Sequence, residues 1–118
     1  MKEEKFKVIQ YTKEFIIEIE KELENYPKKD IEIKSKIRNN SFELLEILYE
    51  ANTTIGANKP KKELLEKAIA KVKLIDFLIN LSYDKNLINN RKYARLGEKL
   101  DNIIKYIAGW AKTIKDII

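Results

Sequence analysis

Apolar and small residues recur every three or four positions near the start of the chain. The stripe runs through Ile9, Thr12, Ile16, Ile19, Leu23 and Tyr26. This spacing places its members on one face of an α-helix, for which we expect about 23 residues and a length of some 35 Å. Pro27 cannot extend that helix without losing a backbone hydrogen bond, so we predict that the helix ends at Tyr26.

Three more stripes with the same spacing follow along the chain. They are Ile37, Ser41, Leu44, Leu48, Ala51 and Ile55; Leu65, Ala68, Val72, Ile75, Ile79 and Ser82; and Leu96, Leu100, Ile103, Ile107, Trp110, Ile114 and Ile117. Short connections between helices force neighbours to run antiparallel. We therefore predict an all-α fold, an up-down-up-down antiparallel four-helix bundle, with residues 1–118 forming a single domain.

Residues with known preferences for helix ends stand between the stripes. Asp30 is placed to cap the second helix with its carboxylate, and Pro60 suits the first turn of the third. Asn86 can adopt the left-handed conformation that ends the third helix, and Asn89 or Asn90 can cap the fourth. These signals agree with the boundaries that the stripes predict.

Several predicted helices carry additional apolar residues beside the main stripe. These residues are Phe42 and Tyr49 on the second helix, Leu64, Leu74, Phe77, Leu78 and Leu81 on the third, and Ile104, Ala111 and Ile118 on the fourth. One explanation is a wide face turned to the core, as globular helices often have. The alternative, which we favour, is that part of this surface is covered by other copies of the chain, because a monomer would expose a large apolar patch.

Composition narrows the class of protein. Of 118 residues, 44% are hydrophobic and 36% charged, with three Gly and two Pro, a profile typical of long helices. No apolar run approaches the roughly 18 residues of a membrane span, and the N-terminus lacks the apolar stretch of a signal peptide. We therefore expect a cytoplasmic protein that has no membrane contact.

The sequence lacks the side chains on which most enzymes depend. It has no His and no Cys, which removes the usual proton carrier near neutral pH and the common zinc and di-iron ligand sets. No Gly-rich phosphate loop occurs. The carboxylates Glu18, Glu20, Glu22 and Glu24 are interpreted as a solvated helix face. We predict a protein that is not an enzyme and has no metal or cofactor.

Positive charge increases toward the C-terminus. Residues 1–26 carry 5 Lys/Arg against 7 Asp/Glu, whereas residues 87–118 carry 7 against 3, within a formal net charge of +5. Such a surface attracts RNA or DNA, although a merely solvated Lys-rich face has the same composition. The candidate nucleic-acid-binding residues are Arg91, Arg95, Lys105 and Lys112 on the fourth predicted helix, with Lys34 and Arg38 at the edge of the core on the second.

Gly109 lies inside the strongest predicted helix, next to Trp110. A mid-helix glycine costs up to about 1 kcal/mol relative to alanine, so a packing reason is expected. We predict that Gly109 lets another helix approach closely while the Trp110 indole fills the adjacent space.

Several segments, taken in order, resemble one known family. They are Tyr26-Pro27-Lys28-Lys29-Asp30, Ile37-Arg38-Asn39-Asn40, Leu44-Leu45-Glu46, Glu50-Ala51-Asn52, the run from Leu78 to Ile88, Tyr93, and Ala108-Gly109-Trp110. Their order, loop positions and Gly-Trp placement are similar to those of the four-helix-bundle family of the 23S rRNA intervening-sequence proteins and the diversity-generating retroelement accessory protein Avd. The resemblance spans roughly Tyr26 to Lys112.

This resemblance implies a homopentameric ring of bundles with a basic surface that binds RNA or DNA and partners a reverse transcriptase. Our leading hypothesis is accordingly a non-enzymatic, oligomeric nucleic-acid-binding accessory protein. The alternative is a structural or protein-interaction bundle of the intervening-sequence type, in which the basic face has no nucleic-acid role.

Overall fold

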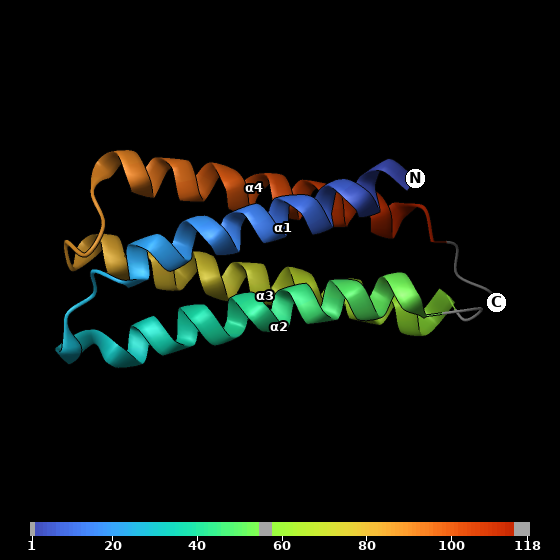
Figure 1. Cartoon of the computed structure of the whole chain (residues 1–118). Coiled ribbons are helices and arrows are strands. Elements are labelled where there is room, and N and C mark those ends of the chain that lie inside the picture. The colour runs from blue at the N-terminus through green and yellow to red at the C-terminus, as the bar shows by residue number, and fades with distance from the viewer. Residues whose placement is uncertain (1, 55–57, 115–118) are drawn as a thin grey trace.

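The computed structural model of the chain describes residues 2–54 and 58–114. These residues form four α-helices, α1 (Lys2–Leu23), α2 (Ile31–Thr53), α3 (Asn58–Asp84) and α4 (Asn90–Lys112), with a short 3-10 helix, η1 (Lys28–Asp30), before α2. Figure 1 shows successive helices running in opposite directions along an elongated body measuring 50 × 23 × 20 Å. The predicted up-down-up-down four-helix bundle is confirmed.

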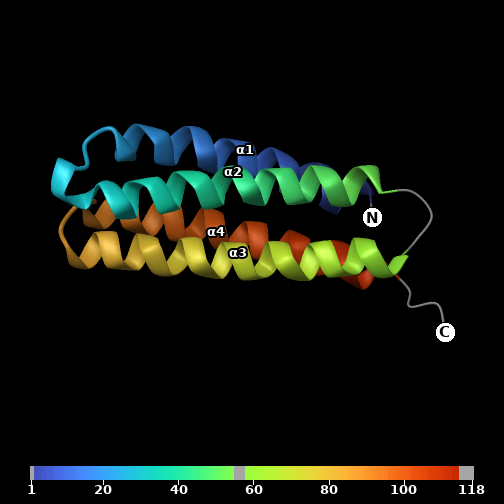
Figure 2. The same cartoon turned by 90° about the horizontal axis from the view of Figure 1, so that it is seen from below.

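The helices occupy the corners of a square, in chain order. Helix α1 contacts α2 and α4, and α3 contacts the same two neighbours. Among the described residues, no Cα atoms of the diagonal pairs α1–α3 and α2–α4 come within 8 Å of each other. Figure 2 shows the same bundle from below, with α2 and α3 lying side by side. Because of this order, charged residues of α1 can pair with those of α2 and α4.

The core contains the predicted stripes together with residues outside them, such as Val8 and Phe15. The described members of the stripes are at most 8% exposed, except for the partly buried Ile114. Three hydroxyl-bearing members, Thr12, Ser41 and Ser82, are also buried. Each donates to the carbonyl oxygen four residues earlier, at 2.7 to 2.9 Å, which satisfies the polar group inside the core. Ile55 and Ile117 of the predicted stripes lie outside the described residues.

Local signals placed two of the connections correctly. Asn86 adopts a positive φ of 63° just after α3, where a left-handed residue ends the helix. Asn89 accepts a hydrogen bond from the backbone N–H of Lys92 at 2.8 Å and so caps α4. Pro60 lies in the first turn of α3, where its missing N–H costs nothing.

The first connection differs from the prediction in two respects. Helix α1 ends at Leu23, and Tyr26 reaches the core from the turn that follows, at 7% exposure. Asp30 precedes α2 but forms no capping hydrogen bond with its side chain. Its buried carboxylate instead lies 3.2 Å from the Lys85 ammonium, near the end of α3. The prediction of an Asp30 cap was wrong because a cation from a distant helix end attracts the carboxylate.

The additional apolar residues separate into two groups. Leu78 is buried, and Leu64, Leu81, Ile104 and Ala111 are partly buried. Phe42, Tyr49, Leu74 and Phe77 remain exposed, whereas Ile118 lies outside the described residues. In the part of the chain that the structure describes, no helix has the length and apolar character to cross a membrane.

Candidate nucleic-acid interface

Helix α4 turns a row of cations away from the bundle. Its buried side consists of Leu96, Leu100, Ile103, Ile107 and Trp110. Arg91, Lys105 and Lys112 are exposed and stand at multiples of seven residues, so they follow one line along the helix. We call these three residues the α4 basic row. At 1.5 Å per residue the row is about 30 Å long, and Glu98 interrupts it.

The cations of the row have few partners within the chain. In the described ranges no ion pair engages Arg91, Lys105 or Lys112. The Lys105 ammonium lies 6.0 Å from the centre of the Tyr106 ring, which is a weak contact at an exposed site. The row is therefore available to an external anion.

Arg95 and its neighbours on the α1 side of α4 are already neutralised. The Arg95 guanidinium contacts the Glu18 carboxylate at 2.5 Å, and the Lys99 ammonium lies 3.7 Å from the same group. One turn away, the Lys92 ammonium lies 3.0 Å from Glu22. Arg95 was predicted to contribute to the binding face; in the structure its guanidinium joins this salt-bridge network, while 64% of its side chain stays exposed.

Arg38 on α2 is held in a comparable way on the other side of α1. Its Nε and one terminal nitrogen each donate to Glu20, both at 2.8 Å. These hydrogen bonds, opposed by partial burial and aided by the charges of Arg38 and Lys34, lower the pKa of the Glu20 carboxyl below its usual value. Lys34 is half-buried one turn earlier.

Within one chain the structure does not bring the two predicted groups of cations together, and their combination in an oligomer stays a prediction. Lys34 and Arg38 belong to α2, the basic row belongs to α4, and α1 and α3 separate these helices. Carboxylates of α1 lie between the two groups of cations. Glu20 faces α2 on one side of α1, and Glu18 and Glu22 face α4 on the other. Sequence reasoning interpreted these carboxylates as solvated, but Glu18 and Glu22 are only 17% and 14% exposed, and Glu24 alone of the four is exposed.

An acidic hollow between α3 and α4 was missed entirely. It is lined by Asp76, Asn80, Tyr93, Ala94, Gly97, Glu98 and Asp101. Ala94 and Gly97 leave room there, and a Cβ added at Gly97 would meet nothing within 4 Å. Burial, with the nearby Asp101, raises the pKa of Asp76. The side of α4 that faces α3 is therefore acidic. The only signal for this hollow in the sequence was the presence of two small residues, Ala94 and Gly97, beside the carboxylates of Glu98 and Asp101 on α4.

Gly109 and Trp110 have different surroundings. The Trp110 indole is 4% exposed and belongs to the core, so it fills space within a single chain. Gly109, at the neighbouring position on α4, is half-buried. A second helix lying against Gly109 stays a prediction about the assembly.

Comparison with models of known families, with curated proteins and with solved structures finds no match. Among the residues that the structure describes, no group of three or more Asp or Glu side chains is arranged to hold a metal ion.

Proposed function

We propose that the protein is a non-enzymatic, self-associating bundle that binds RNA or DNA in the cytoplasm through the α4 basic row. The observation that supports this most strongly is a line of three exposed cations without acidic partners in the described part of the chain. Other cations, such as Arg38 and Arg95, pair with carboxylates across helix boundaries. The three members of the row share one line of α4, so they can act on one anion together.

The mode of binding follows from the chemistry of the row. Arginine and lysine side chains on one line can contact successive phosphates, and phosphates carry no sequence information. Three contacts are weak on their own, but an oligomer presents the row several times, and linked contacts strengthen one another. The family resemblance sets the copy number in this proposal at five, and it adds a reverse transcriptase as protein partner.

A fluorescence-anisotropy titration with labelled single-stranded RNA and DNA at several salt concentrations tests this function. The wild type should bind both with little sequence preference, and affinity should fall steeply with salt as counterions are released. Arg91→Glu/Lys105→Glu should abolish binding at 150 mM salt, about physiological ionic strength, while leaving the oligomer folded. Lys28→Glu/Lys29→Glu is the matched control, because it makes the same charge change at exposed positions in η1.

Two outcomes would count against the proposal. Equal loss in the two double variants would show that only net charge matters. No binding by the wild type at low salt would remove the nucleic-acid role. The remaining candidate would then be a protein-interaction module, which the exposed apolar side chains of α1, α2 and α3 favour.

A further inference from the structure

The large apolar side chains that stay exposed lie in two places. Among the described residues they are Ile17, Ile31, Phe42, Tyr49, Leu74 and Phe77. Such residues scattered singly would need no explanation, but contiguous ones mark an interaction surface.

The first place is the outer side of α3. Leu74 and Phe77 are 42% and 59% exposed, and Ala70 and Leu81 continue the same line at helical spacing. These four residues, the α3 stripe, lie opposite the buried line that contains Val72 and Ile79. The stripe therefore points away from the core, although Leu81 at its end is partly buried.

The second place is the outer side of the α1–α2 boundary. Ile31, Phe42 and Tyr49 fall on one line of α2, at intervals of eleven and seven residues. Ile17 belongs to the facing part of α1. Two contacts bracket it: Lys13 stacks over the Tyr49 ring at 5.6 Å, and Glu20 pairs with Arg38. We call these four residues the α1/α2 patch.

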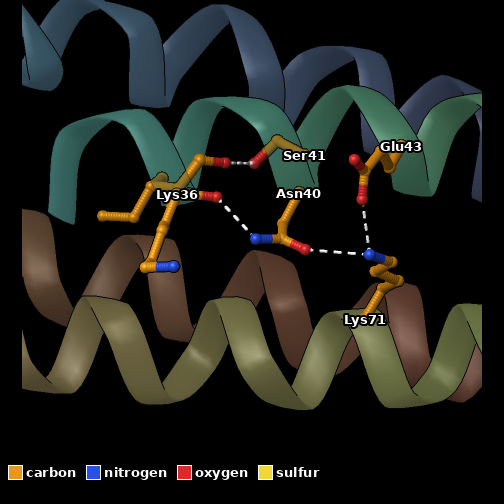
Figure 3. Close-up of polar contacts among 6 residues, drawn as sticks. Lys36, Asn40, Ser41, Glu43 and Lys71 are labelled. Atoms are coloured by element: carbon orange, nitrogen blue, oxygen red, sulfur yellow. Dashed lines mark hydrogen bonds and ion pairs between the residues drawn. The ribbon is translucent and has the colours of Figure 1, made fainter. Parts of the chain in front are cut away.

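The stripe and the patch lie at matching heights along the bundle. Figure 3 shows Lys71 of α3 donating to Asn40, at 3.0 Å, and to Glu43, both on α2. Ala70, beside Lys71, is thus level with Phe42. Because α2 and α3 are antiparallel with the same rise per residue, Leu81 is about level with Ile31. Copies standing side by side would bring one surface directly opposite the other.

Charge also matches at one end of this arrangement. Glu63 and Glu66 are exposed at the start of α3, eight and five residues before Lys71. The same register places them near the height of Tyr49, where the exposed Lys13 ammonium sits. An acidic end of the stripe would therefore meet a cationic end of the patch.

The apolar area of the two surfaces also favours a contact between the stripe and the patch. A half-exposed aromatic or large aliphatic side chain leaves on the order of 100 Å² uncovered, so each surface offers a few hundred Å² of apolar area. A stable interface buries about 800 Å² per partner, somewhat more than half of it apolar. Pairing two α3 stripes would leave the patch uncovered, whereas a contact between stripe and patch covers both.

We propose that copies of the chain assemble head to tail, with the α3 stripe of one copy packed against the α1/α2 patch of the next. This inference rests on the self-association proposed above and specifies its two faces. Head-to-tail contacts use different surfaces on the two partners, and they close into a ring when the rotation between the surfaces permits.

Complementation between two variants tests the arrangement. Phe77→Glu blocks the stripe and Phe42→Glu blocks the patch, and both side chains are exposed, so folding should persist by circular dichroism. Light scattering should give the mass of one chain, 14.0 kDa, for each variant alone. An equimolar mixture should give particles of two chains, because one intact stripe and one intact patch remain. Asn39→Glu, which adds the same charge at an exposed position of α2 outside the patch, should keep the mass of the wild type.

Other outcomes overturn the inference and separate it from its premise. A Phe42→Glu variant that keeps the wild-type mass would indicate a contact that does not use the patch, such as pairing of two α3 stripes. A mixture that stays monomeric would also exclude the head-to-tail contact. A monomeric wild type at micromolar concentration would remove the self-association itself, independently of how well the basic row binds RNA or DNA.

Discussion

The Arg38 guanidinium of α2 and the Glu20 carboxylate of α1 form a two-pronged ion pair, with both nitrogen–oxygen distances at 2.8 Å. The planar guanidinium matches the carboxylate, so the pair fixes how α1 and α2 are rotated against each other. About a third of each side chain is exposed, so water and salt weaken the attraction. The pair thus contributes more to the register of the helices than to the stability of the bundle.

Removing this pair should have a modest cost that depends on pH. Arg38→Gln should lower the free energy of unfolding by about 0.5 kcal/mol at pH 7. Because the folded protein lowers the pKa of Glu20, the stabilisation is complete above the ordinary carboxyl pKa and is lost as pH falls through the folded-state pKa. Urea unfolding of Arg38→Gln, Glu20→Gln and the double variant at pH 7 and pH 3 measures the coupling between the two residues. A coupling that persists unchanged in acid would contradict this account.

Asp76→Asn should stabilise the bundle at neutral pH. Burial and the neighbouring Asp101 raise the pKa of Asp76, so folding opposes its ionisation. Stability is therefore lost as pH rises from the ordinary Asp pKa through the folded-state pKa, and asparagine avoids this loss. We expect a gain of up to about 0.5 kcal/mol at pH 7 and none at pH 3. Thermal unfolding of the wild type and Asp76→Asn at both pH values measures this gain, and Asp84→Asn, at an exposed position, is the control. An equal gain in stability at pH 7 and pH 3 would indicate a cause other than charge.

Tyr26→Phe should leave stability unchanged or raise it by about 1 kcal/mol. The Tyr26 hydroxyl is buried beside that of Ser82 but makes no hydrogen bond of normal length among the described residues, so its removal relieves an unsatisfied polar group. Ser82→Ala is the informative comparison, because the Ser82 hydroxyl already donates to Leu78 at 2.9 Å and its loss brings no such relief. The fluorescence of Trp110, the only tryptophan, can follow urea unfolding of both variants. A loss of more than about 1 kcal/mol in Tyr26→Phe would indicate a bound water that satisfies the hydroxyl.

The binding face could be predicted only in part. The outward position of the α4 basic row follows from the seven-residue spacing of its members and from the apolar line that excludes them from the core. That Arg38 and Arg95 are neutralised could not be predicted, because Glu20 and Glu18 are distant from them in sequence and meet them only through the packing of α1.

The sequence by itself determined the helices, their main buried faces and two of their ends. Periodicity is a local property, since residues three or four apart share one side of a helix wherever that helix lies. Asn86 and Asn89 likewise act within a few residues of their own backbone. Tertiary structure alone decided how each helix is rotated within the bundle. Phe77 and Leu78 are adjacent and both apolar, yet they are 59% and 5% exposed. Their different burial depends on which neighbours flank α3, and those neighbours come from remote parts of the chain.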